Sequence, residues 1–256
     1  MNLNPRQTEI LSLARSMGRV MVDDLAKHFD VAAQTIRRDL GDLADLGHLD
    51  RVHGGAVPRQ GMVNIAYERR RKLNASGKQA IGAAVAAAIP ENSSVILTLG
   101  TTTEAVAQAL LHHRSLTVIT NNMNVANILG ANPGCDIVVT GGALRRSDGG
   151  LVGALTAEFF GQFKVDIAVL GASALDQDGD LLDYDLAEVR VSRAILAQAR
   201  TAFVVADHMK LTRSAPARIA SLSQVAKLFT DQPLPPDLAR RCAEWGCEVV
   251  VAPPLA

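Results

Sequence analysis

The stretch VDDLAKHFDVAAQTIRRDLGDLADL (Val22–Leu46) decides the fold of the N-terminal part of this chain. Its apolar residues recur at helical spacing in two blocks, residues 22–29 and residues 32–46. Ile36 and Leu40, from the second block, share one face of the predicted helix. Two helices joined by so short a turn are typical of a helix-turn-helix unit, in which the second helix contacts DNA bases.

The opposite side of this second helix carries side chains that suit DNA. Gln34 and Arg38 point away from the apolar face, and Thr35 and Arg37 lie on its flanks. Glutamine binds adenine edges, arginine binds guanine or phosphate, and threonine suits either kind of contact. The sequence therefore predicts a DNA-contacting face on this helix.

Two further features complete a winged helix-turn-helix domain over residues 1–57. A preceding helix is predicted over residues 5–16 from the same spacing of apolar residues. His48–Val57 carries β-type residues around a Gly-Gly pair, which predicts a small hairpin that would form the wing. Arg51 and His53 on this wing would then lie near the DNA phosphates.

Net charge does not decide between DNA binding and its alternatives. Lys+Arg and Asp+Glu number 26 each, so the formal net charge is zero, and residues 1–60 also carry equal numbers of basic and acidic side chains. The second helix could present a merely solvated polar face, and winged helices also serve protein contacts. DNA binding through a local basic surface is the favoured interpretation, and protein docking is the alternative.

The larger part of the chain has a different pattern, in which short apolar runs alternate with helical stretches. These β-like runs begin at Val95, Leu116, Asp136, Val165, Thr201, Val225 and Cys247. Their alternation with helices predicts an α/β domain with a mostly parallel sheet that is covered on both faces. Before it, we expect Tyr67–Ile89 to form one long helix. We divide the chain into residues 1–57, a linker with the start of the connecting helix over 58–74, and an α/β domain over 75–256.

Small polar residues gather at the carboxyl ends of the predicted strands, where open parallel sheets bind ligands. Gly100, Thr101 and Thr102 offer a close backbone approach, hydroxyl groups and a helix N-terminus, which suit a phosphate, although threonine also caps helices for structural reasons. The other strand ends contribute Asn121, Asn122, Gly141, Gly142, Arg145 and Gly171, and the charged candidates are Asp183, Glu188, Asp207 and Lys210. Turn chemistry explains each strand end alone, but the whole set predicts a site for a small polar ligand.

Several classes of protein and of site are disfavoured by the composition. The longest apolar run, Ala83–Ile89, is far shorter than the ~20 residues of a membrane helix. The first twenty residues lack the apolar stretch of a signal peptide, so we expect a cytoplasmic protein without membrane contact. Cys135, Cys242 and Cys247 match no zinc-site spacing, and we expect neither a metal nor a cofactor.

The stretch from Val22 to Val57, which contains TIRRDL and HGGA, resembles the winged helix-turn-helix of the DeoR-type family of bacterial sugar-metabolism repressors. The resemblance covers nearly the whole chain. It implies a DNA-binding repressor of a carbohydrate or polyol operon without catalytic residues. Its implied partners are operator DNA and a small phosphorylated polyol or sugar, in first place glycerol 3-phosphate, and it implies a homo-oligomer, either a dimer or a tetramer.

The α/β half resembles the effector domain of the same family, which is similar in fold to ribose-5-phosphate isomerase, glucosamine-6-phosphate deaminase and CoA transferases. In that wider group a Gly-Thr loop binds phosphate, a glutamate ahead of a helix serves as base, and an Asp-x-x-Lys pair lines the pocket. Carried over by this resemblance, the loop corresponds to Gly100–Thr102, the glutamate to Glu188, and the pair to Asp207 and Lys210.

The sequence departs from the family pattern at two places in this half. Thr98 stands where many relatives have an aspartate, and His208 and Met209 replace two serines. The alternative function is a sugar-phosphate isomerase or deaminase with an appended helical domain. Thr98 disfavours this alternative, because a hydroxyl group cannot act as an acid at neutral pH.

Overall fold

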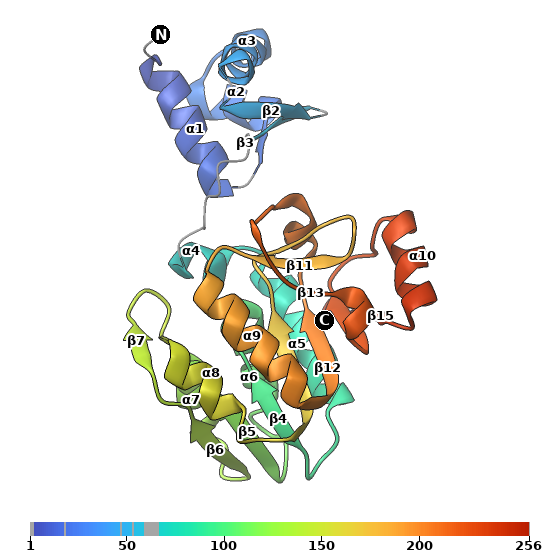
Figure 1. Cartoon of the computed structure of the whole chain (residues 1–256). Helices are drawn as coiled ribbons and strands as arrows, with labels where there is room; N and C mark the ends of the chain where they lie inside the picture. Colours follow the sequence, from blue (N-terminus) through green and yellow to red (C-terminus); the bar gives the residue numbers. More distant parts are fainter. Residues whose placement is uncertain (1–2, 18, 47, 53, 59–66, 256) are drawn as a thin grey trace. The chain divides into compact units, whose positions relative to one another are not determined.

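The computed structural model describes residues 3–17, 19–46, 48–52, 54–58 and 67–255. They belong to two compact units, Met1–Ile65 and Ala66–Ala256 (Figure 1). Within the described ranges, no helix has both the length and the apolar character needed to cross a membrane.

The described part of the first unit has the winged helix-turn-helix fold that the sequence predicts. Its elements are α1 (Pro5–Met17), β1 (Val20–Met21), α2 (Val22–Phe29), α3 (Ala33–Asp45), β2 (Leu49–Val52) and β3 (Gly55–Pro58). The three strands form an antiparallel sheet in the order β1-β3-β2. Ile10, Leu25, Ile36, Leu40 and Leu43 meet in a buried core that holds the three helices together.

The backbone of the hairpin requires glycine at both positions of the Gly-Gly pair. Gly54 has a φ of 74°, in the left-handed region that glycine adopts most easily. Gly55 pairs with Met21 across the sheet, and a Cβ atom at this position would lie 2.0 Å from the carbonyl oxygen of Val20. Only glycine therefore allows β3 to pair this closely with β1.

The second unit is built on a seven-stranded sheet in which every neighbouring pair is parallel, as the sequence predicts. In spatial order the strands are β15 (Glu248–Val251), β14 (Lys227–Thr230), β12 (Ala199–Val205), β9 (Val165–Gly171), β4 (Ser94–Leu97), β5 (Leu116–Thr120) and β6 (Cys135–Val139). From β4 the chain proceeds through β5 to β6 on one side and then returns to β9 on the other side of β4. This reversal between β4 and β9 creates the crevice in which open α/β sheets bind ligands.

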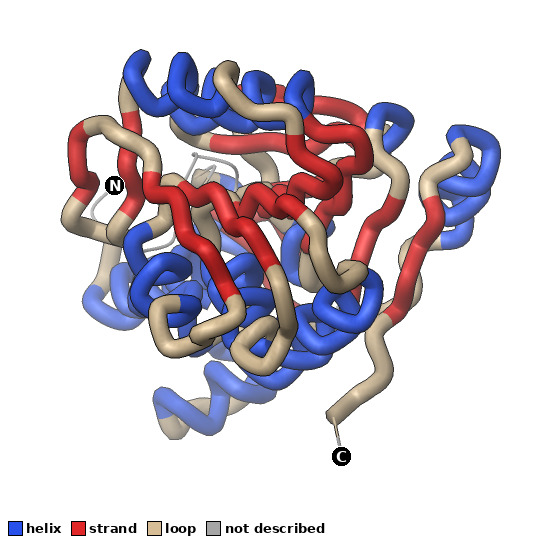
Figure 2. The backbone as a smooth tube through the Cα atoms, turned by 90° about the horizontal axis from the view of Figure 1, so that it is seen from below, coloured by secondary structure: helices blue, strands red, loops and turns tan. Residues whose placement is uncertain are grey.

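Helices cover both faces of this sheet (Figure 2). One face packs against α5 (Ala75–Ala88), α6 (Thr101–Ala109) and α7 (Met123–Leu129). The other face packs against α8 (Ala154–Phe160), α9 (Leu186–Gln198) and α10 (Pro236–Trp245), together with a small antiparallel sheet of β10 (Ala174–Leu175), β11 (Asp180–Asp183) and β13 (Ala217–Ser221). The remaining elements are the hairpin β7 (Ala143–Arg145) and β8 (Gly150–Val152), and the short 3-10 helices η1 (His208–Thr212) and η2 (Leu222–Gln224).

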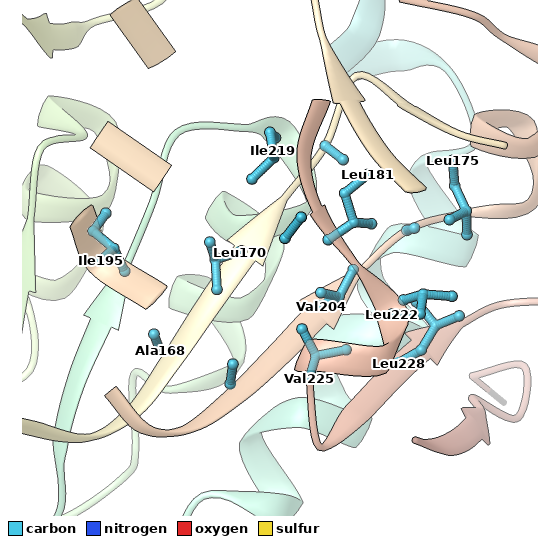
Figure 3. Close-up of a cluster of buried hydrophobic side chains, with 14 of the residues drawn as sticks. Ala168, Leu170, Leu175, Leu181, Ile195, Val204, Ile219, Leu222, Val225 and Leu228 are labelled. Carbon is cyan, nitrogen blue, oxygen red and sulfur yellow. The ribbon is translucent and has the colours of Figure 1, made fainter. Parts of the chain in front are cut away.

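The two apolar cores follow from the alternation of side chains along each strand. Val95 and Leu97 of β4 enter the core beneath α5 and α6, whereas Ile96 enters the opposite core. Figure 3 shows that opposite core, where Leu170 of β9 and Ile195 of α9 are among the buried side chains. The sheet is therefore buried on both faces, and its ligands can enter only at its ends.

The prediction of one long helix over Tyr67–Ile89 is wrong. The chain forms two helices, α4 (Tyr67–Lys72) and α5, and it breaks at Asn74, whose φ is 49°. The Asn74 side chain donates a hydrogen bond to Asp231 Oδ2 at 2.8 Å. Lys78 Nζ donates to the carbonyl oxygens of Arg70 and, at 2.6 Å, of Leu73, which satisfies backbone acceptors at the end of α4.

Candidate functional site

The outward face of α3 carries the predicted DNA-contacting side chains. Gln34, Arg37 and Arg38 are exposed and Thr35 is half-buried. Ile36, on the opposite side of the helix, is fully buried. The structure thus brings these four polar residues to one accessible helix surface, as the spacing predicts.

Two acidic residues of α3 accept hydrogen bonds from side chains of α1. These contacts determine which charges α3 presents on its outward surface. Asp39 is buried and accepts a hydrogen bond from Arg6 Nε at 2.6 Å. Gln7 Nε2 donates to Asp39 at 3.5 Å and to Asp42 Oδ2 at 3.3 Å. These contacts hold the carboxylates toward α1, so the basic groups Arg37 and Arg38 dominate the outward surface of the N-terminal half of α3.

The predicted wing supplies one further basic side chain. Arg51 is exposed on β2 and pairs in register with Ala56 of β3. His53, the other residue predicted on the wing, lies outside the described residues.

A pocket opens at the carboxyl ends of the strands, at the reversal between β4 and β9. Residues that follow β4 and β9 line it, together with residues from α4, α9 and the segment after β12. It brings together these predicted ligand-binding residues: Gly100, Thr101, Thr102, Asn121, Gly171, Asp183, Glu188 and Lys210. Thr98 also lines the pocket, where its hydroxyl oxygen accepts a hydrogen bond from the Gly171 N–H at 3.2 Å and joins the two strand ends.

Two basic residues, Arg70 and Lys210, line this pocket, and the charges of Arg213 and Lys78 act on Lys210. Lys210 is buried, and its pKa is lowered to about 7, first by burial and then by the positive charges of Arg213, Arg70 and Lys78, with Asp207 acting in the opposite direction. Arg70 also lines the pocket, and its Nε atom is buried without a hydrogen-bond partner among the described residues. Buried basic donors, one of them this Arg70 Nε atom, favour an anion at this part of the pocket.

Acceptors and acidic groups lie in the same pocket. The Oδ1 atom of Asn121 is buried and has no hydrogen-bond partner within the described part of the chain. Burial, followed by the nearby charge of Asp183, raises the pKa of Glu188 to about 7, although Arg145 Nη2 lies 2.5 Å from Glu188 Oε1 and favours the charged form. The pocket therefore offers hydroxyl-binding groups as well as anion-binding groups.

Five predicted residues do not line the pocket and have structural contacts instead. Asn122 caps α7 by accepting from the N–H groups of residues 124 and 125, and Asp207 caps η1 in the same way. Gly142 has a φ of 137°, and the carbonyl oxygen of Gly141 accepts from Thr156. Arg145 forms ion pairs with Glu188 and with Asp148 and Asp185, the last two at 2.6 and 3.0 Å.

Tyr67, Arg70 and Asp148 also line the pocket, although they are not among the residues predicted to bind the ligand. Tyr67 and Arg70 belong to the run YERRRK, which is strongly basic and lies immediately before the α/β domain. A basic run in this position is a sequence signal for an anion site, but periodicity does not show which of its basic residues faces the sheet.

Comparisons with known proteins agree with this two-part architecture. Residues 6–60 match the DeoR-like helix-turn-helix domain, and residues 73–232 match the DeoR C-terminal sensor domain. The chain is 41% identical over 235 residues to the glycerol-3-phosphate regulon repressor of Escherichia coli K12, which covers 92% of this chain and 93% of that protein. It is 45% identical over 225 residues to the glycerol-3-phosphate regulon repressor of Haemophilus influenzae, with 88% of each chain covered.

Among solved structures, the chain is distantly similar to ribose 5-phosphate isomerase A from Neisseria gonorrhoeae, with 12% identity, a TM-score of 0.38 and 52% of each chain covered. The two domain matches and the identity of 41% and 45% to the two repressors cover most of the chain and establish its family. With a helix-turn-helix domain at its N-terminus and a sensor domain built around a polar pocket, this chain belongs to the DeoR family of transcriptional regulators.

Proposed function

We propose that the protein represses a polyol or carbohydrate catabolic operon and leaves its operator when glycerol 3-phosphate binds the pocket. Operator binding is assigned to α3 and to the β2–β3 wing. The observation that carries the effector class is the basic cluster around Lys210 at the reversal between β4 and β9. The names of the relatives from E. coli and H. influenzae support glycerol 3-phosphate in particular.

Isothermal titration calorimetry with matched ligands tests this effector class. Glycerol 3-phosphate is expected to bind, whereas glycerol is expected not to, because the basic groups contact the phosphate. Equal binding of glycerol would contradict a phosphate site. Binding of ribose 5-phosphate or glucosamine 6-phosphate, but not of glycerol 3-phosphate, would retain the phosphate site and overturn the choice of polyol.

The protein is proposed to act as a homo-oligomer in the cytoplasm. Helix-turn-helix proteins commonly place two recognition helices on half-sites separated by about one turn of DNA. A second copy of this chain would supply the second α3. Light scattering of the full-length protein is expected to give a dimer or a tetramer, and a monomer in the DNA-bound state would contradict the proposal.

The wing is expected to contribute affinity without base preference. Arg51→Ala should weaken binding to all DNA sequences alike and lower the magnitude of the salt slope by about one, because one phosphate contact is lost. Binding measured by fluorescence anisotropy at several salt concentrations, on operator and on random duplexes, gives both quantities. A loss confined to the operator would instead make Arg51 a base contact.

The pocket is proposed to bind its ligand without turning it over. An isomerase needs a free carboxylate base and an acid near the reacting carbons. Here Arg145 contacts Glu188, and Thr98 provides only a hydroxyl group that accepts from Gly171.

Glu188→Gln separates the sensor from the enzyme. We expect this variant to fold, to bind operator DNA normally without ligand, and to lose about 1 kcal/mol of effector binding through a weakened hydrogen bond to a ligand hydroxyl. Long incubation of both proteins with ribose 5-phosphate, glucosamine 6-phosphate and glycerol 3-phosphate, followed by NMR of the small molecules, is expected to show no conversion. Conversion by the parent that disappears in Glu188→Gln would establish an enzyme.

A further inference from the structure

The short helix α4 lies next to the inter-domain segment in the chain and also contributes to the pocket wall. In the chain it is the first described element after residues 59–66, which follow the winged helix-turn-helix unit. In the sensor unit it forms part of the pocket wall, through Tyr67 and Arg70. A ligand in the pocket therefore lies against the helix through which the sensor unit is connected to the DNA-binding unit.

Polar contacts hold α4 on the sensor unit, and none of its residues is fully buried. Tyr67 Oη donates a hydrogen bond to Glu104 Oε2 at 2.8 Å and accepts one from Asn124 Nδ2 at 2.9 Å. Arg70 Nη2 lies 3.6 Å from Asp148 Oδ2, which is too long for a direct hydrogen bond. A short helix that has no fully buried residue and is attached through polar contacts changes its docking equilibrium when one strong contact is added or lost.

The guanidinium of Arg70 has one hydrogen-bond donor that is unpaired among the described residues. Its Nε atom is buried without a partner among the described residues, while its Nη2 atom is directed at Asp148. The other basic residue that lines the pocket, Lys210, belongs to η1, and Lys78, whose charge acts on Lys210, belongs to α5. Arg70 is thus the member of the basic cluster that α4 carries.

We propose that Arg70 Nε donates a hydrogen bond to the phosphate of the effector and that this bond couples the pocket to α4. The inference rests on the proposed function, because it takes the ligand to be a phosphorylated polyol. An oxyanion that accepts from Arg70 Nε satisfies the buried donor and adds a charge-assisted contact between α4 and the sensor unit. The effector then favours the docked arrangement of α4 by the free energy of that contact, which is the differential affinity that coupling requires.

The test compares Arg70→Gln, Arg70→Lys and the control Arg71→Gln in the full-length protein. Arg71 is the adjacent residue of α4, carries the same charge and is exposed. Calorimetry is expected to show glycerol 3-phosphate binding weakened about 10- to 100-fold in Arg70→Gln, and weakened in Arg70→Lys as well, because lysine keeps the charge but lacks the Nε donor. Arg71→Gln should bind like the parent.

Two further readouts distinguish coupling from binding alone. Hydrogen–deuterium exchange of residues 67–73 should slow when glycerol 3-phosphate saturates the parent, but not when higher concentrations saturate Arg70→Gln. The effector-induced loss of operator affinity, measured at saturation for each protein, should shrink at least about fivefold in Arg70→Gln. A residue that only adds affinity would leave this saturated response unchanged.

The outcomes separate the inference from the proposed function. Parent-like effector affinity in Arg70→Gln, or a parent-like operator response once that variant is saturated, would overturn the role of Arg70 and leave the phosphate sensor intact. Failure of the parent itself to bind glycerol 3-phosphate or any other phosphorylated ligand of the panel would overturn the proposed function, and the inference with it.

Discussion

Lys210→Met is expected to weaken the binding of glycerol 3-phosphate by about 2 kcal/mol or more, because it truncates one partner of a buried charge pair. Lys210 is buried and lines the pocket, so its ammonium group would be a desolvated partner of the phosphate. Calorimetry at pH 7 measures the loss. Lys164→Met is the matched control, since Lys164 is exposed and lies outside the pocket. Effector affinity equal to that of the parent in Lys210→Met would place the phosphate elsewhere.

The lowered pKa of Lys210 gives this variant two further signatures. A bound phosphate favours the charged ammonium, so above its pKa of about 7 the effector should bind together with a proton. Effector affinity should therefore fall as the pH rises from 6.5 to 8.5, and it should fall less in Lys210→Met. Without effector, a lysine pKa below the unfolded value means that the folded state loses stability as the pH falls from 10 to 7. Methionine removes this loss, so the Tm of the unliganded variant at pH 7 should rise.

Arg38→Ala is expected to lower operator affinity by about 1–3 kcal/mol, which is the range for one base-specific arginine contact. The side chain is exposed on α3, on the side opposite to the buried Ile36. Fluorescence anisotropy at one fixed salt concentration, on the operator and on single-base variants of it, measures both affinity and preference. Arg114→Ala, which removes an exposed arginine of the sensor unit, serves as the control.

The pattern of losses across DNA sequences decides the role of Arg38. A base contact predicts that the preference relaxes at one position of the operator, while random duplexes lose little affinity. A uniform loss on all duplexes would make Arg38 a phosphate contact instead. Parent-like binding of Arg38→Ala to every duplex would remove α3 from the interface altogether.

The elements that the sequence predicts well are those that local periodicity specifies. The apolar spacing of Ile36, Leu40 and Leu43 is that of an α-helix, and α3 follows it. The strands of the large sheet are short apolar runs because both faces are buried, and each of the seven predicted runs contains or overlaps a strand. The loop Gly100–Thr102 lies in the pocket because the carboxyl ends of parallel strands meet at one edge.

The features that the sequence does not predict depend on contacts between distant segments. The break between α4 and α5 is fixed by Asn74, whose partner Asp231 is 157 residues away in the chain. Before the fold is known, the run that contains Arg70 is simply a basic stretch, and only the position of α4 shows which side chain enters the pocket. The hairpin β7–β8 and the sheet of β10, β11 and β13 consist of strands of two to five residues, too short for an alternating pattern to stand out.

The most direct test of effector-controlled repression is the operator affinity of the full-length protein with and without glycerol 3-phosphate. The DNA is a fluorescent duplex that the protein selects from a random pool, and anisotropy is measured at a fixed salt concentration. We expect saturating glycerol 3-phosphate to raise the Kd for this duplex at least about fivefold, and glycerol to leave it unchanged. An unchanged Kd in the presence of glycerol 3-phosphate that calorimetry shows to be bound would contradict control of the operator by this pocket.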